Sequence, residues 1–260
     1  MGIFHAVILG IVEGVTEFLP ISSTGHLILA SNLLRIPTTE FLKSFEITIQ
    51  LGAILAVVVL YWKDLFVRWD VMKRIAVAFV PTALVGLILY PVIKKVLLGS
   101  TGVVIWSLLL GGIALILFER FQKKYPPDER SVVGDIEKIS YSQALFIGAC
   151  QSVAVIPGVS RAAATIVGGL LINLKRKTIV EFSFLLAVPT MLAATALDLS
   201  KSASSFASAD FGVLVIGFVV SFVVALFVVR WFIRFVQSHT FTAFGWYRIA
   251  VAALFLLFVL

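Results

Sequence analysis

The stretch EGVTEFLPISSTGH, residues 13–26, interrupts an apolar segment that runs from Gly2 to Leu34. Pro20 stops a helix there, because proline lacks a backbone N–H and its ring clashes with the preceding turn. A second apolar segment, Tyr141–Asn173, is interrupted in the same way by VIPGVSRAAAT, residues 155–165. Each segment is therefore predicted to form two short helices that are joined at a proline-centred break.

Around these breaks the chain has the composition of an integral membrane protein. Of its 260 residues, 60% are hydrophobic and 13% are charged, and the mean hydropathy is +1.09. Soluble domains are about 45–50% apolar and about 25% charged, so a soluble globular protein and a disordered chain are both excluded. The single cysteine, Cys150, excludes a disulfide scaffold and a multi-cysteine metal site. The formal charge of +7 rests on few charged residues, so we expect it to reflect membrane topology and not nucleic-acid binding.

Six further segments are predicted to be transmembrane helices, which need about 20 mostly apolar residues. They are Ile47–Tyr61, Ile75–Val92, Val103–Phe118, Phe182–Leu197, Phe211–Val229 and Ile249–Leu260. Non-helical backbone is tolerated at membrane depth only where protein or water satisfies it. Each broken segment is therefore predicted to be a re-entrant hairpin, or a broken helix that lines a cavity. The predicted fold class is an all-α integral membrane protein with six transmembrane helices and two re-entrant helical hairpins.

The two broken segments are predicted to be copies of one unit. Serine follows proline by three residues in both, at Pro20–Ser23 and Pro157–Ser160, and the three spans after each break are similarly spaced. The chain is thus predicted to be a single membrane domain, 1–260, with repeat halves 1–118 and 141–260 and a polar linker, 119–140. If each hairpin returns to its own side, each half crosses the membrane three times, and the halves are inverted because three is odd.

The basic residues indicate which side of the membrane is cytoplasmic. In the re-entrant arrangement, 5 of the 21 Lys and Arg residues lie on the side of the N-terminus and 15 lie on the other side. The remaining one, Arg161, is expected to be the only basic residue in the interior, and Arg248 counts among the 15. Because cytoplasmic loops are rich in Lys and Arg, the linker is predicted to be cytoplasmic and both termini extracytoplasmic.

Two acidic residues in the first broken segment are candidates for chemistry. Glu13 and Glu17 lie four residues apart, so they share a helix face, and ionisable groups at membrane depth are usually functional. The pair suits a hard cation such as Mg²⁺ or Ca²⁺. Alternatively, one carboxyl group acts as an acid or base, or the pair makes only a polar contact inside the bundle.

The first break also offers hydroxyl groups and a histidine. Ser22, Ser23 or Thr24 can cap the helix that follows, and the free N–H groups of a helix N-terminus favour an anion. His26 follows Ser23 within one helical turn, so it can activate that hydroxyl or protonate a leaving group. The alternative is simple capping beside a buried histidine whose hydrogen bonds are satisfied.

The second break carries the opposite charge. Gly158 allows close approach of the backbone, Ser160 can cap the next helix, and Thr165 adds a hydroxyl one turn later. The guanidinium group of Arg161 matches phosphate or carboxylate oxygens; alternatively, it only neutralises a glutamate of the first break. Hairpins that enter from opposite faces meet near the midplane, so these groups are expected to converge on a phosphate or diphosphate.

Two polar residues of the first span are candidates to support the hairpin. Glu46 and Gln50 lie four residues apart on one helix face. Solvation of Glu46 at the membrane interface is an equally good interpretation. Glu181 and Ser183 occupy the matching place in the second half.

These motifs resemble those of a known family. The stretches 13–26, 45–52, 157–165 and 182–186 are similar to the undecaprenyl-diphosphate phosphatases, the bacitracin-resistance integral membrane phosphatases, and the resemblance covers nearly the whole chain. In one departure, Ala162 and Ala163 stand where the family usually has Ser-Gly, which removes a hydroxyl.

The resemblance implies hydrolysis of undecaprenyl diphosphate to undecaprenyl phosphate, the recycled lipid carrier for peptidoglycan and other envelope polymers. It implies dependence on a divalent metal and a bacterial plasma-membrane enzyme whose site opens to the extracytoplasmic side. In such a site Arg161 would stabilise the transferring phosphoryl group, and Glu13 and Glu17 would hold the metal or position water. Ser23 would be the nucleophile or a phosphate ligand, with His26 as its acid–base partner. The alternatives are a polyprenyl-phosphate flippase, since inverted repeats with broken helices are a transport architecture, and a non-catalytic lipid-binding protein.

Overall fold

The computed structural model describes residues 1–92, 100–126, 132–202 and 211–259. This part of the chain is helical, with eleven α-helices and two short 3₁₀ turns. The α-helices are α1 (Ile3–Thr16), α2 (Ser23–Leu33), α3 (Glu40–Leu60), α4 (Trp62–Phe66), α5 (Trp69–Val92), α6 (Thr101–Lys124), α7 (Tyr141–Ser152), α8 (Arg161–Leu171), α9 (Arg176–Ser202), α10 (Phe211–Phe235) and α11 (Thr242–Val259). The 3₁₀ turns are η3 (Ile136–Lys138) and η4 (Val153–Val155).

Five of these helices are long and apolar enough to cross a membrane, namely α3, α5, α6, α9 and α10. The protein is therefore a multi-pass membrane protein. The sixth predicted span, Ile249–Leu260, corresponds to α11, which begins earlier, at Thr242. Its described apolar part, Thr242–Leu257, falls among the shorter apolar helices.

Several helices extend beyond the predicted apolar segments, because caps and terminal charges set their ends. Thr39 caps α3, its Oγ1 accepting from Leu42 N at 3.2 Å, so this helix begins seven residues before the predicted Ile47. The predicted span Val103–Phe118 is longer in the structure, where α6 continues six residues into the polar linker predicted over 119–140. It ends on two lysines, Lys123 and Lys124, which complement the helix dipole. Within the linker, residues 127–131 lie outside the described part of the chain.

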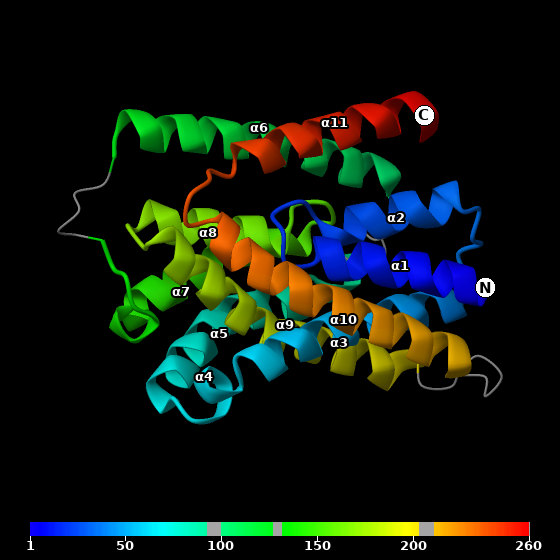
Figure 1. Ribbon diagram of the computed structural model, residues 1–260, viewed down its shortest axis with the longest axis horizontal. Helices are drawn as coiled ribbons and strands as arrows, with labels where there is room; N and C mark the ends of the chain where they lie inside the picture. Colours follow the sequence, from blue (N-terminus) through cyan, green and yellow to red (C-terminus); the bar gives the residue numbers. More distant parts are fainter. Residues whose placement is uncertain (93–99, 127–131, 203–210, 260) are drawn as a thin grey trace.

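The helices form a body and a separate pair. In the body, α3 and α1 pack along α10, α5 packs on α7, and α9 fills the middle. Gly10 and Gly14 let α1 approach the backbone carbonyls of Gly217 and Ser221 on α10, as small residues do between membrane helices. The pair consists of α6 and α11, which pack mainly on one another and lie along one edge of the molecule (Figure 1).

Both broken segments are hairpins whose arms are too short to span a bilayer. Their arms have 14 and 11 residues (α1 and α2) and 12 and 11 residues (α7 and α8). At 1.5 Å per residue the longest arm measures about 21 Å, against about 30 Å of hydrocarbon. Figure 1 shows the two hairpins opening toward opposite ends of the molecule, with their tips in the middle, whereas α1 begins and α11 finishes at the same end.

The backbone gives the two hairpins a common register. Among the described residues, the four non-glycine residues with positive φ are Ser22 (72°), Ser160 (78°), Arg35 (52°) and Asn173 (62°). The first two cap α2 and α8, the last two follow the ends of these helices, and both pairs are 138 positions apart (160 − 22 and 173 − 35). The matching of Ser23 with Ser160 is therefore off by one residue. Proline spacing suggested it, but the structural equivalent of Ser160 is the N-cap Ser22.

Candidate active site

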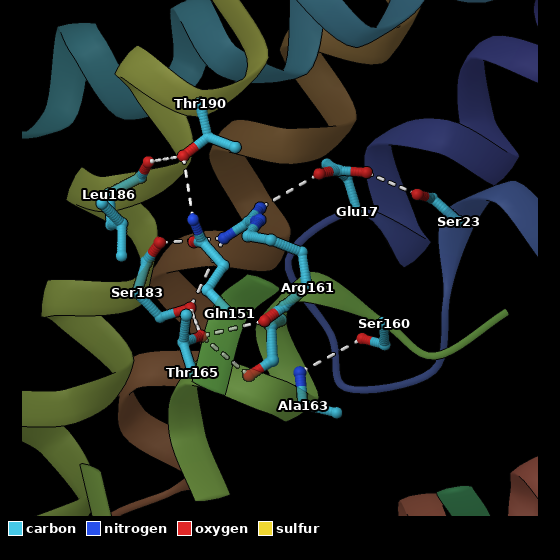
Figure 2. Close-up of polar contacts among 11 residues, drawn as sticks. Glu17, Ser23, Gln151, Ser160, Arg161, Ala163, Thr165, Ser183, Leu186 and Thr190 are labelled. Carbon is cyan, nitrogen blue, oxygen red and sulfur yellow. Dashed lines mark hydrogen bonds and ion pairs between the residues drawn. The ribbon is translucent and has the colours of Figure 1, made fainter. Parts of the chain in front are cut away.

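The two hairpin tips bring together residues that are far apart in the sequence (Figure 2). Glu17 is the C-cap of α1, Ser23 is the first residue of α2 and Arg161 is the first residue of α8. The N-termini of α2 and α8 therefore lie close together, on either side of Glu17. Their free N–H groups make this place suitable for an anion.

Glu17 connects the two breaks. Ser23 Oγ donates to Glu17 Oε2 at 2.5 Å, and Arg161 Nη2 donates to Glu17 Oε1 at 3.0 Å. The Glu17 side chain is 6% exposed and the Arg161 side chain 12%, so the ion pair is buried. A carboxylate that accepts a serine hydroxyl is placed to take its proton, which is how serine nucleophiles are activated.

Arg161 is held from behind by α9 and keeps one donor free. Its Nη1 donates to Ser183 O at 2.8 Å, and its guanidinium lies 5.8 Å from the centre of the Phe18 ring. Its Nε is buried and has no hydrogen-bond partner among the described residues. The site thus brings Arg161 to the glutamate, as the counter-ion interpretation expected, and leaves its Nε–H for an incoming anion.

The structure places Thr165 in the support of Arg161. Its Oγ1 shares a 2.6 Å hydrogen bond with Ser183 Oγ and donates to backbone carbonyls of α8, and the residue is fully buried. This hydroxyl therefore ties α8 to α9, whereas the sequence suggested contact with substrate. Of the two matching residues noted in the second half, Ser183 belongs to the site, and Glu181 pairs with Lys177 at 3.8 Å.

Glu13 brings a further unsatisfied group to the site. It is fully buried one turn before Glu17, and neither of its carboxylate oxygens has a hydrogen-bond partner among the described residues. Glu46 on α3 is close enough for its carboxyl group to interact electrostatically with that of Glu13. Glu46 and Gln50 are half-buried, and their side chains make no hydrogen bond to the other residues that the structure describes, so the predicted support of the hairpin by these two side chains is not seen as direct bonding.

The predicted caps are present in both breaks. Ser22 Oγ accepts from Gly25 N at 3.4 Å, and Ser160 Oγ accepts from Ala163 N at 3.2 Å. Thr24 lies half-buried in the first turn of α2 and is not the cap. Gly158 has φ +92°, and a side chain there would meet α6, so this position requires glycine.

His26 is oriented by two bonds, neither of them to Ser23. Its Nδ1 lies 2.7 Å from Ser22 O, and because a carbonyl can only accept, Nδ1 carries the proton. In the neutral ring Nε2 is then an acceptor, and it lies 2.8 Å from the hydroxyl of Tyr247, whose ring stacks on the imidazole. The sequence did not single out Tyr247 as a partner, because tyrosine near the end of an apolar segment is typical of membrane interfaces.

The expectation that Arg161 is the only basic residue in the interior is wrong. Arg248 on α11 is 0% exposed and hydrogen-bonded to backbone carbonyls of both breaks. The signal in the sequence was an arginine within an apolar helix, which usually marks function. The adjacent Trp246 and Tyr247 obscure this signal, because Trp and Tyr are enriched at membrane interfaces and make an interfacial arginine the more obvious interpretation.

Together these features define a class of protein. It is a multi-pass membrane protein with a buried site in which a serine, a carboxylate and an arginine meet at two helix N-termini. Such a site is suited to an anion and to proton transfer from a nucleophile.

Comparison with known proteins places the chain within this class. Residues 6–254 match the family described as bacitracin resistance protein BacA, and the chain belongs to this family. It is similar to the undecaprenyl-diphosphatase of Aquifex aeolicus, with 51% identity over 257 residues that cover 99% of this chain and 98% of the relative. The undecaprenyl-diphosphatase of Persephonella marina is 51% identical over the full length of both chains, and that of Thermus thermophilus is 46% identical over 99% and 97% of the two chains. The family resemblance drawn from the motifs is confirmed.

Proposed function

We propose that this protein is an undecaprenyl-diphosphatase, which hydrolyses undecaprenyl diphosphate to undecaprenyl phosphate and inorganic phosphate. Full-length relatives of that name support the substrate. The observation that carries the chemistry is the chain of bonds from Ser23 through Glu17 to Arg161, which joins a hydroxyl, a base and a cation. In the cell this reaction returns the lipid carrier to envelope synthesis and confers resistance to bacitracin.

The proposed first step is attack by Ser23 Oγ on the terminal phosphorus. The hydroxyl proton passes to Glu17, to which it is already bonded. The bond from the phosphorus to the bridging oxygen breaks, and undecaprenyl phosphate leaves with that oxygen and its electron pair. Arg161, with its free Nε–H, and the N–H groups at the starts of α2 and α8 stabilise the phosphoryl oxygens.

In the proposed second step, water hydrolyses the phosphoserine. The water oxygen bonds the phosphorus as the phosphorus–Oγ bond breaks, and Glu17 returns its proton to Oγ. Inorganic phosphate leaves with one proton of the water, and the other proton passes to a base. We assign that role to His26 Nε2, which accepts from the Tyr247 hydroxyl, because Nδ1 already carries a proton that is fixed on Ser22 O. Direct attack by water on the diphosphate is the rival mechanism, and trapping of a phosphorylated Ser23 during turnover decides between them.

A divalent cation, Mg²⁺ or Ca²⁺, is proposed as cofactor. The buried and unpaired oxygens of Glu13 fit a hard cation, and Glu13 with Glu17 would hold it. When bound, the ion would neutralise diphosphate charge. We expect exhaustive chelation to abolish phosphate release and added Mg²⁺ or Ca²⁺ to restore it. Full activity after chelation would remove the metal from the proposal.

The proposed membrane arrangement is an inverted repeat with two re-entrant hairpins and α11 as the sixth span. The short hairpin arms, their opposite directions and their common backbone register support it. We place the protein in the bacterial plasma membrane with both termini outside. The first hairpin then enters from outside, and the site opens on that side.

The test of this function is phosphate release from undecaprenyl diphosphate by the purified protein in lipid nanodiscs. We expect turnover by the native protein and none above background by Ser23→Ala. The matched control is Ser31→Ala in the same helix, whose buried hydroxyl has no hydrogen-bond partner among the described residues. Transfer of lipid across a bilayer without phosphate release would favour the flippase alternative instead.

A further inference from the structure

Arg248 occupies an unusual place for a charged residue. It is fully buried, and all five N–H groups of its guanidinium bind backbone carbonyls. Burying a cation is costly unless its hydrogen bonds are made. The five charge-assisted hydrogen bonds therefore offset the cost of removing the Arg248 guanidinium from water.

The carbonyls bound by Arg248 come from three separate parts of the chain. Nη1 donates to Pro20 O in the first break at 3.3 Å and to Val159 O in the second break at 2.9 Å. Nη2 donates to Gly158 O, also in the second break, at 2.9 Å. Nη2 and Nε bind α6 through Ser107 O at 2.9 Å and Leu108 O at 3.3 Å. One planar group thus fixes both breaks to each other and to the α6–α11 pair.

The bound carbonyls lie immediately before the reactive residues. Pro20 precedes the cap Ser22 and the proposed nucleophile Ser23, and Gly158 and Val159 precede the cap Ser160 and Arg161. Both caps have positive φ, a conformation that costs non-glycine residues energy and persists only when the surroundings enforce it.

We propose that Arg248 is a positioning residue that fixes the relative position of the two helix N-termini of the active site, those of α2 and α8. It does so by binding the backbone of both breaks at once. This inference rests on the proposed function for its effect on turnover, but its effect on the breaks is independent of it. Lysine cannot replace Arg248, because an ammonium group has three donors around one nitrogen where the guanidinium has five in a plane.

Gly111 offers a way to disturb these bonds without removing the charge. A methyl group on Gly111 of α6 would collide with the guanidinium of Arg248, so Gly111→Ala forces the guanidinium to shift. The matched control is Gly102→Ala in the same helix, where the nearest atom to the new methyl lies 4.0 Å away. Arg234→Lys, at an exposed arginine of α10, is the control for Arg248→Lys.

The experiment measures hydrogen–deuterium exchange and phosphate release on the full-length protein. We expect Gly111→Ala and Arg248→Lys to speed exchange at residues 20–26 and 157–164 together, with α10 unchanged. We expect turnover to fall by about 100-fold, the scale of a misplacement of about 1 Å in an active site. Both controls should match the native protein.

Several results would overturn the proposal. They are native-like turnover of a folded Gly111→Ala protein, faster exchange at only one break, or global unfolding of both variants, which would make Arg248 a residue of the fold alone. If the native protein released no phosphate while both breaks still loosened together in the variants, the proposed function would fail and the positioning role would stand.

Discussion

Glu17→Gln is the substitution that most directly tests the active site, because Glu17 accepts one bond from each break. The glutamine has nearly the same shape but only one acceptor oxygen. Arg161 has no acceptor atom, so we expect the amide oxygen to face Arg161 Nη2 and the amide NH₂ to face Ser23. The hydrogen bond to Ser23 is then reversed, and the hydroxyl loses its proton acceptor.

The expected losses follow from these two bonds. Removing a positioned general base costs about 10²–10⁴-fold in rate. Removing one partner of a buried ion pair lowers the free energy of unfolding by about 3–5 kcal/mol. The neutral hydrogen bond that remains between the glutamine and Arg161 offsets about 1 kcal/mol of this loss. A net destabilisation of about 2–4 kcal/mol corresponds to a fall in Tm of about 4–16 °C. Phosphate release and thermal unfolding of the same preparation measure both quantities.

Glu119→Gln is the matched control for this prediction. Glu119 is also buried, and it binds Arg176 through two bonds of 2.5 and 2.7 Å and accepts from Phe241 N. It sits at the far end of α6 and is not part of the site. We expect it to lose stability as Glu17→Gln does while the folded protein keeps its turnover. A loss of less than about tenfold in Glu17→Gln would refute the general-base assignment.

Three further predictions concern other parts of the protein. Arg161→Lys should lose about 100-fold in phosphate release, the scale of one lost transition-state donor; near-native turnover would make it a structural counter-ion. Tyr247→Phe removes one hydrogen bond to His26 and should cost about 2–10-fold in the same assay; unchanged turnover would show that His26 needs no such partner. With Cys150→Ala, single cysteines in the linker 119–140 should be labelled by an impermeant reagent only from inside; labelling from outside would overturn the topology.

Much of the fold could be predicted because it depends on local rules. Proline predicted both breaks, apolar length predicted the spans, and hydroxyl residues after each proline predicted the caps. Helix ends were harder to predict, since a polar turn such as residues 119–124 continues a helix whenever its terminal bonds and charges are satisfied. No periodicity reveals that.

The site could be predicted from the polar and charged residues that lie within apolar segments. Glu13, Glu17 and Arg161 are expensive in a membrane, so their presence indicated function. Partners were harder to assign, because Ser23 is close in sequence to His26 yet bonds Glu17, six residues before it. The roles of Arg248 and Tyr247 could not be inferred, since they arise from α11 meeting breaks more than 80 residues away in the chain.

The register of the proposed repeat explains why its two halves have diverged. At the offset of 138 residues, Glu13 corresponds to Gln151 and Ser23 to Arg161. Gln151 is buried, and its Nε2 donates to the hydroxyls of Thr82 and Thr190. A glutamate at 151 would add another buried carboxylate to the group of residues drawn around Arg161 (Figure 2), and an arginine at 23 would replace the nucleophile with a second cation. Like charges in a low-dielectric interior repel strongly, so two identical halves could not share one centre. Divergence gives this centre its acid and its hydroxyl from the two sides of the first break and its cation from the second break, on a backbone geometry that both breaks share.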